Sequence, residues 1–233
     1  MIRRIAAKFE QLYAKTNSDR YINFLRKKGV RIGEDCQFFG IKELHIDLTQ
    51  PSLIEIGNKV RITRGVMLLT HGYDWAVLRE LYGEVIGRAG HILINDNVFI
   101  GTWAKIMPGV TINENSIIGV GSLVTKDVEA NSVVAGVPAK KIYTIEEYYN
   151  VRKQRYIEEA KNYARSIKRN LGRMPTPEDF PEFFPLFLER NEGKFGKIPV
   201  RYQTRDKFND FMKSEPLYRN FKEFIEASFN EIQ

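Results

Sequence analysis

The stretch INDNVFIGTWAKIMPGVTINENSIIGVGSLV, residues 94–124, places an aliphatic side chain at every sixth position. These positions are Ile94, Ile100, Ile106, Ile112, Ile118 and Val124. Each of the first five is followed, four residues later, by a small or branched residue: Val98, Ala104, Val110, Ser116 and Ser122. Six residues advance an α-helix by about 600°, so these aliphatic side chains would point in three directions and form no apolar face. The period therefore argues against a helix.

The same period suits short extended segments, because residues two apart on a strand share a face. Short strands joined by corners, with one inward aliphatic residue each, build a solenoid of triangular cross-section with about 18 residues per coil. An all-β solenoid of hexapeptide repeats is therefore expected, and an ordinary β-sandwich is the alternative. Residues 18 apart should stack: Ile94 on Ile112, Ile100 on Ile118, and Ile106 on Val124.

The frame extends upstream and is interrupted once. Ile56, Ile62 and Leu68 keep the period, and a weak first copy begins at Ile32. Between Leu68 and Ile94 lie 26 positions where six are expected, which predicts that about residues 72–91 leave the solenoid as a loop. Because this loop is rich in apolar residues, we expect it to pack on its own coil or on a neighbouring subunit.

The two ends of the chain lack the hexapeptide period. We expect a helical N-terminal segment over residues 1–29, the β-helix over 30–143 and a helical C-terminal extension over 144–233. Residues 145–170 read as a basic amphipathic helix that ends near Gly172. Two apolar stripes mark the terminal helices: Ile5, Phe9, Leu12 and Tyr13 in the first segment, and Phe221, Phe224, Ile225 and Phe229 in the last. The second stripe predicts packing against the protein itself.

Composition narrows the classes of partner and compartment. The net charge of +7 favours anionic partners such as nucleic acid, anionic lipid or a phosphate-bearing cosubstrate. Glu158 and Glu159 interrupt the basic helix, and no nucleic-acid motif accompanies it, so no nucleic-acid partner is expected. Cys36 is the only cysteine, which excludes an internal disulfide. No apolar run reaches the roughly 18 residues of a transmembrane helix, and we expect a cytoplasmic protein.

Three stretches resemble the hexapeptide-repeat acyltransferases, above all the galactoside, maltose and capsule or lipopolysaccharide O-acetyltransferases. The stretches are THGYDW, INDNVFIGTWAKIMPGVTINENSIIGVGSLVTKDV and NSVVAGVPAKKI. The resemblance implies a left-handed parallel β-helix and a homotrimer with each active site between two prisms. It also implies acetyl-CoA as cosubstrate, no tightly bound cofactor, and transfer of the acetyl group to a hydroxyl of a sugar or polysaccharide precursor.

The resemblance assigns the catalytic groups to two positions. His71, the last residue before the frame breaks, stands where the family has its general base. A neutral imidazole near pH 7 suits removal of a proton from an attacking hydroxyl. The backbone N–H of Thr102 would stabilise the oxyanion, acting from a different chain of the trimer. Asp74 or Glu80 could orient His71 by accepting its other N–H.

The resemblance also assigns residues to the two substrates. Coenzyme A would lie along a groove formed by Gly101, Thr102, Gly119, Val120, Thr125, Lys126 and Lys140. Phe99 replaces a tryptophan of the family, which removes an N–H donor from that wall. The acceptor would meet Tyr73, Asp74, Trp75 and Trp103. Trp103 is also interpreted as a trimer contact, and His91 as a structural residue or an acceptor contact.

Three other functions remain alternatives. An N-acetyltransferase would act on an amino sugar or antibiotic, and a binding or scaffold protein would have no activity. A γ-type carbonic anhydrase would need three histidines on zinc, two of them close in sequence. His45, His71 and His91 are separated by 26 and 20 positions, so we expect no metal site.

Overall fold

The computed structural model describes residues 10–230, which form two compact units with a boundary between Tyr148 and Tyr149. Each unit has its own core of buried apolar side chains. Among the described residues, no helix is both long enough and apolar enough to cross a membrane.

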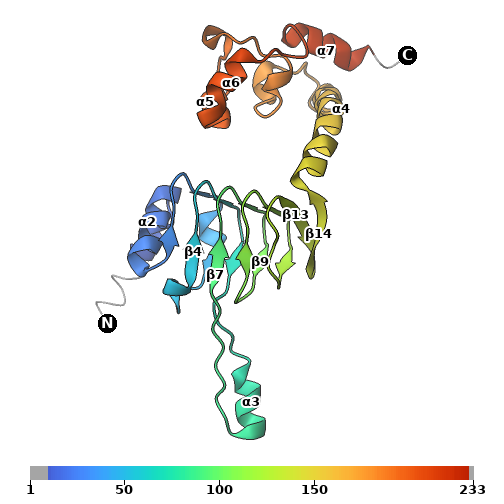
Figure 1. Cartoon of the computed structure of the whole chain (residues 1–233). Coiled ribbons are helices and arrows are strands. Elements are labelled where there is room, and N and C mark those ends of the chain that lie inside the picture. The colour runs from blue at the N-terminus through green and yellow to red at the C-terminus, as the bar shows by residue number, and fades with distance from the viewer. Residues whose placement is uncertain (1–9, 231–233) are drawn as a thin grey trace. The chain divides into compact units, whose positions relative to one another are not determined.

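The first unit is a solenoid of very short strands arranged in three sheets (Figure 1). Its strands are β1 (Arg31–Ile32), β2 (Gln37–Phe38), β3 (His45–Ile46), β4 (Ile54–Ile56), β5 (Arg61–Ile62), β6 (Met67–Leu68), β7 (Ile92–Ile94), β8 (Phe99–Ile100), β9 (Lys105–Ile106), β10 (Thr111–Ile112), β11 (Ile117–Ile118), β12 (Leu123–Val124), β13 (Ser132–Gly136) and β14 (Ala139–Thr144). The sheets have the orders β1-β4-β7-β10, β14-β13-β11-β8-β5-β2 and β12-β9-β6-β3. All pairs are parallel except β13 with β14.

The predicted stacking is confirmed residue by residue. The three pairs found in register are Ile94 with Ile112, Ile100 with Ile118, and Ile106 with Val124. These aliphatic side chains are buried and fill the prism. The small or branched residues four positions later are also buried, next to the corners: Val98, Ala104, Val110, Ser116 and Ser122.

The first coil is longer than the regular coil of 18 residues. Ile32 pairs with Ile56, 24 positions later, and Ile46 pairs with Leu68, 22 positions later. The additional residues form two short 3-10 turns, η1 (Ile41–Glu43) and η2 (Pro51–Leu53). Register is therefore kept although the spacing is not 18, because the turns absorb the extra residues outside the strands.

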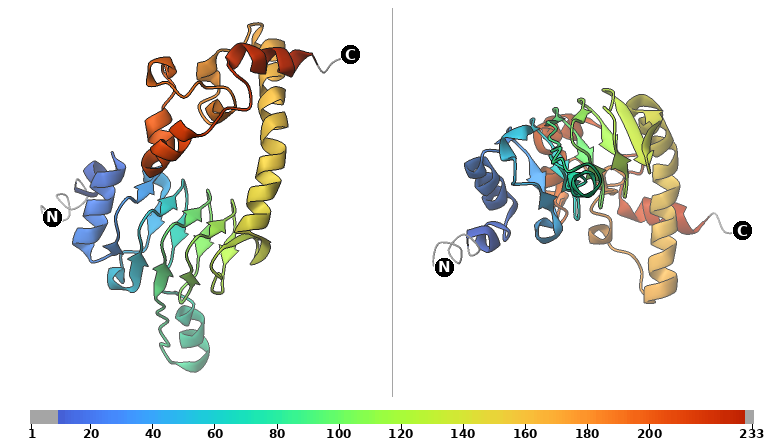
Figure 2. Two further views of the ribbon diagram at one scale, coloured as in Figure 1. Left: turned by 45° about the horizontal axis from the view of Figure 1, so that its top comes forward. Right: turned by 90° about the horizontal axis from the view of Figure 1, so that it is seen from below.

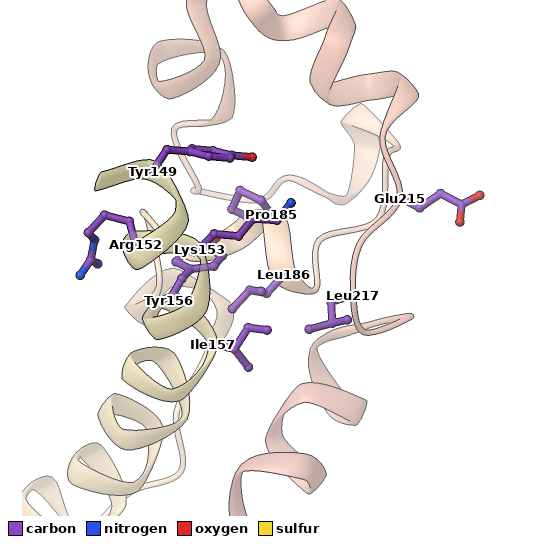
Figure 3. Close-up of a pocket in the computed structure, with 9 residues that line it drawn as sticks. All are labelled: Tyr149, Arg152, Lys153, Tyr156, Ile157, Pro185, Leu186, Glu215 and Leu217. Atoms are coloured by element: carbon purple, nitrogen blue, oxygen red, sulfur yellow. The ribbon is translucent and has the colours of Figure 1, made fainter. Parts of the chain in front are cut away.

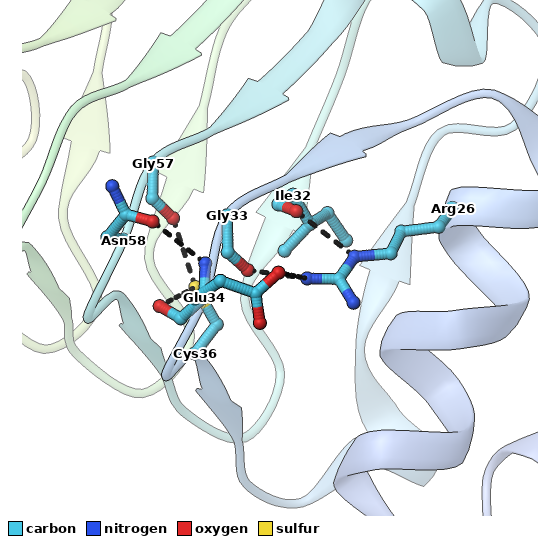
Figure 4. A network of polar contacts seen from close by, with 7 residues as sticks. All are labelled: Arg26, Ile32, Gly33, Glu34, Cys36, Gly57 and Asn58. Atoms are coloured by element: carbon cyan, nitrogen blue, oxygen red, sulfur yellow. Dashed lines mark hydrogen bonds and ion pairs between the residues drawn. The ribbon is translucent and has the colours of Figure 1, made fainter.

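Helix α2 (Ser18–Lys28) covers the start of the solenoid. Its residues Tyr21, Phe24 and Leu25 are buried in the same core as the coils. Arg26 ties the helix to the first coil, donating from Nε to the Ile32 carbonyl at 3.0 Å and from Nη2 to the Gly33 carbonyl at 2.7 Å (Figure 4). The open end of the apolar prism is thereby closed.

The described part of the N-terminal stripe is helical but is not covered by other residues of the chain. Residues 10–14 are helical, as expected, and Leu12 and Tyr13 are exposed. Ile5 and Phe9 lie outside the described residues. Asn17 separates this turn from α2 by accepting hydrogen bonds from the Asp19 and Arg20 N–H groups as an N-cap.

The predicted loop leaves the solenoid and carries a short helix, α3 (Trp75–Tyr82), which projects away from the coils (Figures 1 and 2). None of the residues of α3 is buried, and Tyr73, Leu81 and Tyr82 are largely exposed. The expectation that the loop packs on its own coil is therefore wrong. Packing on a neighbouring subunit stays a prediction.

The second unit consists of helices around a phenylalanine-rich core. Its elements are α4 (Ile145–Leu171, whose first residues belong to the first unit), η3 (Pro177–Asp179), η4 (Phe184–Leu186), η5 (Glu192–Lys194), α5 (Val200–Thr204), η6 (Arg205–Lys207), α6 (Phe208–Lys213) and α7 (Phe221–Phe229). The predicted end of α4 is confirmed, since Gly172 follows with φ 65°. The predicted packing of α7 is also confirmed: Phe224 is fully buried against Phe180 and Phe187.

Candidate active site around His71

His71 is fixed at the base of the projecting loop. It follows β6 by three residues, and its backbone forms an antiparallel bridge with Ala89 on the returning strand of the loop. The Gly90 N–H donates to the Thr70 carbonyl at 2.8 Å, which closes the base of the loop. The His71 side chain is 33% exposed, so the imidazole is held by the fold but can be reached from outside.

A buried carboxylate lies against this imidazole. Oδ2 of Asp47 is 2.5 Å from Nδ1 of His71. The same oxygen accepts from the Thr70 N–H at 3.1 Å and from Thr70 Oγ1 at 2.7 Å, while Oδ1 accepts from the Thr49 N–H at 2.9 Å. Asp47 is only 4% exposed. Four hydrogen bonds therefore fix the carboxylate, and the carboxylate fixes the ring.

The hydrogen bonds keep Asp47 ionised. Burial by itself would raise the pKa of Asp47, but the hydrogen bonds from Thr70, Thr49 and His71 outweigh it and hold that pKa well below its usual range. An ionised carboxylate can only accept, so the proton it shares with His71 sits on Nδ1. In a neutral imidazole with its proton on Nδ1, the lone pair is on Nε2, and no described residue hydrogen-bonds to that nitrogen. The pair can thus act as an oriented general base.

Sequence reasoning missed Asp47 and suggested Asp74 or Glu80 instead. Asp74 lies at the start of α3, and Glu80 pairs with Arg79, so His71 Nδ1 is bonded to neither. Asp47 directly follows β3, whose Ile46 lies beside Leu68 of β6. The available signal was a polar residue directly after the inward-facing Ile46. Because Ile46 and Leu68 are 22 positions apart, which is not a multiple of six, the six-residue period does not identify this coil.

The predicted acceptor residues of the loop lie just beyond His71. The rings of Tyr73 and Trp75 are in contact, with centroids 4.6 Å apart, and the Arg79 guanidinium lies 5.7 Å from the Trp75 ring. Tyr73 and Asp74 are exposed, and Trp75 is half-buried. The loop therefore presents a small aromatic cluster next to the candidate base.

Thr102 occupies a different corner of the prism. Strands β6 and β9 are neighbours in the sheet β12-β9-β6-β3. Thr102 precedes β9, at one end of the strands of this sheet, whereas His71 follows β6, at their other end. The Thr102 carbonyl accepts from the Gly121 N–H at 2.8 Å. Its own N–H makes no hydrogen bond with other described residues. Within a single chain, the candidate base and the candidate oxyanion donor therefore lie at different corners of the prism.

Trp103 is held outward at the same corner. It has φ 63°, in the left-handed region that non-glycine residues seldom adopt, and it is 53% exposed. Its backbone N–H donates to the Arg64 carbonyl at 2.9 Å. The indole lies on the Cα of Gly65, where a Cβ would come within 2.3 Å of the ring. Glycine at position 65 is therefore what allows the indole to lie flat on the preceding coil.

The predicted coenzyme A residues are distributed along two edges and the final strand. Val120, Thr125, Lys126 and Lys140 are exposed, and Gly119 is half-buried. Gly101, predicted as a bare approach for a ligand, is buried instead. A Cβ at Gly101 would lie 2.7 Å from the Ile118 carbonyl and 2.8 Å from the Val120 nitrogen, so the next coil requires glycine there.

The remaining histidines do not form a metal centre. His91 Nε2 lies 2.8 Å from Glu55 Oε1, and Glu55 also pairs with Arg31. His45 is exposed on the outer face of β3. Within residues 10–230, no group of three potential metal ligands comes together.

A prism of six-residue repeats is the fold expected of the hexapeptide-repeat class of transferases, and the comparisons agree with it. The family model for the bacterial transferase hexapeptide, with six repeats, matches residues 91–126. Protein CapG of Staphylococcus aureus is 42% identical over 124 residues, which cover 53% of this chain and 71% of CapG.

Two further proteins are similar to this chain, one over a shorter stretch and one at lower sequence identity. The galactoside O-acetyltransferase of Escherichia coli K12 is 44% identical over 92 residues, which cover 40% of this chain and 44% of that enzyme. The crystal structure of a maltose O-acetyltransferase from Clostridium difficile 630 has 26% identity and a TM-score of 0.42, covering 61% of this chain and 85% of that one. The chain thus spans less than half of the galactoside enzyme. It belongs to the hexapeptide-repeat acyltransferase family.

Proposed function

We propose that this protein transfers the acetyl group of acetyl-CoA to a hydroxyl of a sugar or polysaccharide precursor, with His71 as the general base. The Asp47–His71 pair is the observation that carries the proposal. A buried, ionised carboxylate that holds one ring nitrogen protonated leaves the other nitrogen free to take a proton. The names of the galactoside and maltose O-acetyltransferases support a sugar hydroxyl as the acceptor.

In the proposed reaction, Nε2 of His71 removes the proton of the acceptor hydroxyl as its oxygen attacks the thioester carbonyl. The C–O bond forms while the carbonyl oxygen becomes an oxyanion, which the Thr102 N–H stabilises. The intermediate collapses with cleavage of the C–S bond, and the imidazolium returns its proton to the departing thiolate. The products are the acetyl ester and coenzyme A, so no other reactant is needed.

The separation of His71 from Thr102 favours a site shared between subunits. We infer a homotrimer of left-handed coils, as the family resemblance implies, in which Thr102 of one copy meets His71 of another. Gly101, Gly119, Val120, Thr125, Lys126 and Lys140 are proposed to contact coenzyme A. For Gly101 this role would be indirect, because its glycine is already required by the coil above it.

The acceptor is proposed to lie between the loop and the neighbouring corner. Tyr73 and Trp75 offer adjoining aromatic rings, and Asp74 offers an exposed carboxylate for sugar hydroxyls. Trp103 offers one face of an indole whose other face lies on Gly65. Flat apolar rings beside hydrogen-bonding groups suit the two faces of a pyranose.

Acetyl-CoA-dependent release of free thiol tests the proposal. The purified protein is incubated with acetyl-CoA and sugars, nucleotide sugars or oligosaccharides, and the products are analysed by mass spectrometry before and after hydroxylamine treatment. Sugar-dependent thiol release with a hydroxylamine-labile acetyl group is expected. Release with amines only, giving a stable amide, would instead establish the N-acetyltransferase. No release with either class would leave the scaffold alternative.

A further inference from the structure

The second unit contains a groove that the proposed acetyl transfer does not use. It has a volume of about 480 Å³ and lies between α4 and the segment that follows α6 (Figure 3). We call it the α4 groove and define it by six of its lining residues, which are Tyr149, Lys153, Tyr156, Ile157, Leu186 and Leu217. Its volume falls within the range of small-molecule sites, about 300–1,000 Å³.

The floor of the α4 groove is apolar and belongs to the core of the unit. Leu186 is buried, and Ile157 and Tyr156 are half-buried against the phenylalanine cluster. The Tyr156 ring stacks on Phe183 with centroids 5.3 Å apart. Burial raises the pKa of Tyr156 to about 12, so its phenol is neutral at physiological pH. The floor is therefore preformed and offers few polar groups to a ligand.

Among the described residues that line the mouth of the α4 groove, Lys153 is a cation without an ion pair. Arg152 is neutralised by Glu159, with two N–O distances of 2.8 and 2.6 Å, and in Figure 3 it points away from the groove. Glu215 also points away. Lys153 extends across the groove toward Pro185, and its Nζ lies 5.7 Å from the centre of the Tyr149 ring. No carboxylate among residues 10–230 pairs with it.

An apolar floor below an ammonium that has no carboxylate partner suits an amphiphile with an anionic head. We propose that the α4 groove binds one molecule of an alkyl phosphate, with its hydrocarbon chain along Ile157, Leu186 and Leu217 and its phosphate on Lys153. Leu217 is 58% exposed, so covering it removes apolar surface from water. A sugar fits less well, because the floor has almost no partners for its hydroxyls. This inference does not depend on the proposed acetyl transfer.

Calorimetric titration of the full-length protein with decyl phosphate, below its micelle concentration and without acetyl-CoA, tests the inference. One molecule should bind per chain. Octyl phosphate should bind about tenfold more weakly, because two buried methylene groups are lost. Lys153→Gln should weaken decyl phosphate about tenfold, whereas Lys168→Gln, a lysine four turns further along α4, should leave the affinity unchanged. Leu217→Asp should abolish binding.

Titrations with inorganic phosphate, decanol and phosphatidylglycerol vesicles distinguish an alkyl phosphate site from three other kinds of site. If inorganic phosphate binds with the same affinity as decyl phosphate, the inference is overturned in favour of a simple anion site. If decanol binds with that affinity, it is overturned in favour of an uncharged apolar pocket. Binding only to phosphatidylglycerol vesicles would replace a single amphiphile with a membrane surface. Unchanged affinity of Lys153→Gln, with its circular dichroism spectrum preserved, would also contradict it. His71→Ala should bind decyl phosphate like the unmodified protein, so failure of this proposal and failure of the catalytic one are distinguishable.

Discussion

The proposed chemistry depends on which nitrogen of His71 carries the proton. Asp47 places this proton on Nδ1, because the carboxylate is buried, ionised and 2.5 Å from that nitrogen. Thr70 matters as much as Asp47, because its N–H and hydroxyl both donate to the same carboxylate oxygen. Without Thr70, Asp47 would lose two of the bonds that hold it ionised. Asp47 is a positioning residue, since it acts through the imidazole.

Replacement of Asp47 tests this orienting role. Asp47→Asn should lower kcat about 10–100-fold, the range found when the partner that orients a functional histidine is lost. The KM for acetyl-CoA should stay unchanged, because no acetyl-CoA contact is proposed for Asp47. Asp19→Asn, on the exposed first turn of α2, is the matched control and should keep the original kcat. A higher KM with an unchanged kcat would indicate a binding role instead.

The lowered pKa of Asp47 also predicts a pH dependence of stability. A carboxyl group whose pKa is lower in the folded state stabilises the fold above its ordinary pKa of about 3.9, and this contribution is lost as the pH falls toward its folded value. Asp47→Asn should therefore reduce the free energy of unfolding by about 1–3 kcal/mol at pH 7. This difference should shrink below about pH 4. Urea unfolding of both proteins between pH 3 and 7 measures it, and a difference that grows on acidification contradicts the assignment.

At the scale of strands and turns, each coil has inward positions on its strands and corner positions between them, and the two differ in how well the sequence predicts them. The inward aliphatic residues could be predicted because their period is the period of the strands, and their register is confirmed in three pairs. The need for glycine at two corner positions could not. Gly101 is required by the backbone of the next coil, and Gly65 by the indole of Trp103. Gly101 meets residues 17 and 19 positions later, in the next regular coil, whereas Gly65 and Trp103 are 38 positions apart because the loop lies between them.

Substitution of Gly101 tests the packing between coils. Gly101→Ala places a Cβ 2.7 Å from the Ile118 carbonyl, so neighbouring coils must move apart, and the free energy of unfolding should fall by about 1–3 kcal/mol. Gly87→Ala is the control, because no atom lies within 4 Å of a Cβ built there. Thermal or urea unfolding of the two variants compares them. Equal stabilities would show that the coils adjust without strain.

The projecting loop shows where sequence patterns mislead at this scale. Its apolar content predicted packing, but composition does not specify what covers a surface, and Leu81 and Tyr82 of α3 are exposed in the single chain. An apolar helix without cover is a common sign of an interface. Leu81→Asp should therefore leave the free energy of unfolding of a single chain within about 0.5 kcal/mol.

If the loop lies on a neighbouring subunit, the same substitution should reduce the proportion of trimer in light-scattering measurements. His45→Ala, on the outer face of β3, provides a folded variant for comparison. Retention of the same oligomer by Leu81→Asp would remove the loop from the proposed interface.

For the whole molecule, the two separate cores are the main feature. The solenoid core is aliphatic and built from repeats, whereas the second unit is held by aromatic contacts around Phe180, Phe187 and Phe224. The proposed catalytic residues all lie in the first unit, and the α4 groove lies in the second. Sequence predicted a helical extension here but not the groove, because its walls are brought together only by tertiary packing.

The separate cores predict separate responses to mutation. Phe224→Ala removes a fully buried ring and should destabilise the second unit by about 3–5 kcal/mol. Differential scanning calorimetry of the full chain should show one transition shifted to lower temperature and the other unchanged. A single transition that shifts as a whole would mean that the two units unfold together.

The rate of acetyl transfer after removal of the His71 imidazole is the decisive measurement for the proposed catalysis. Full-length His71→Ala and His45→Ala are compared with the unmodified protein, using acetyl-CoA and a sugar acceptor, with folding checked by circular dichroism. The kcat of His71→Ala should fall by at least about 10²-fold, because the general base is lost, and the kcat of His45→Ala should not change. A folded His71→Ala protein that keeps the original kcat contradicts the proposed catalysis.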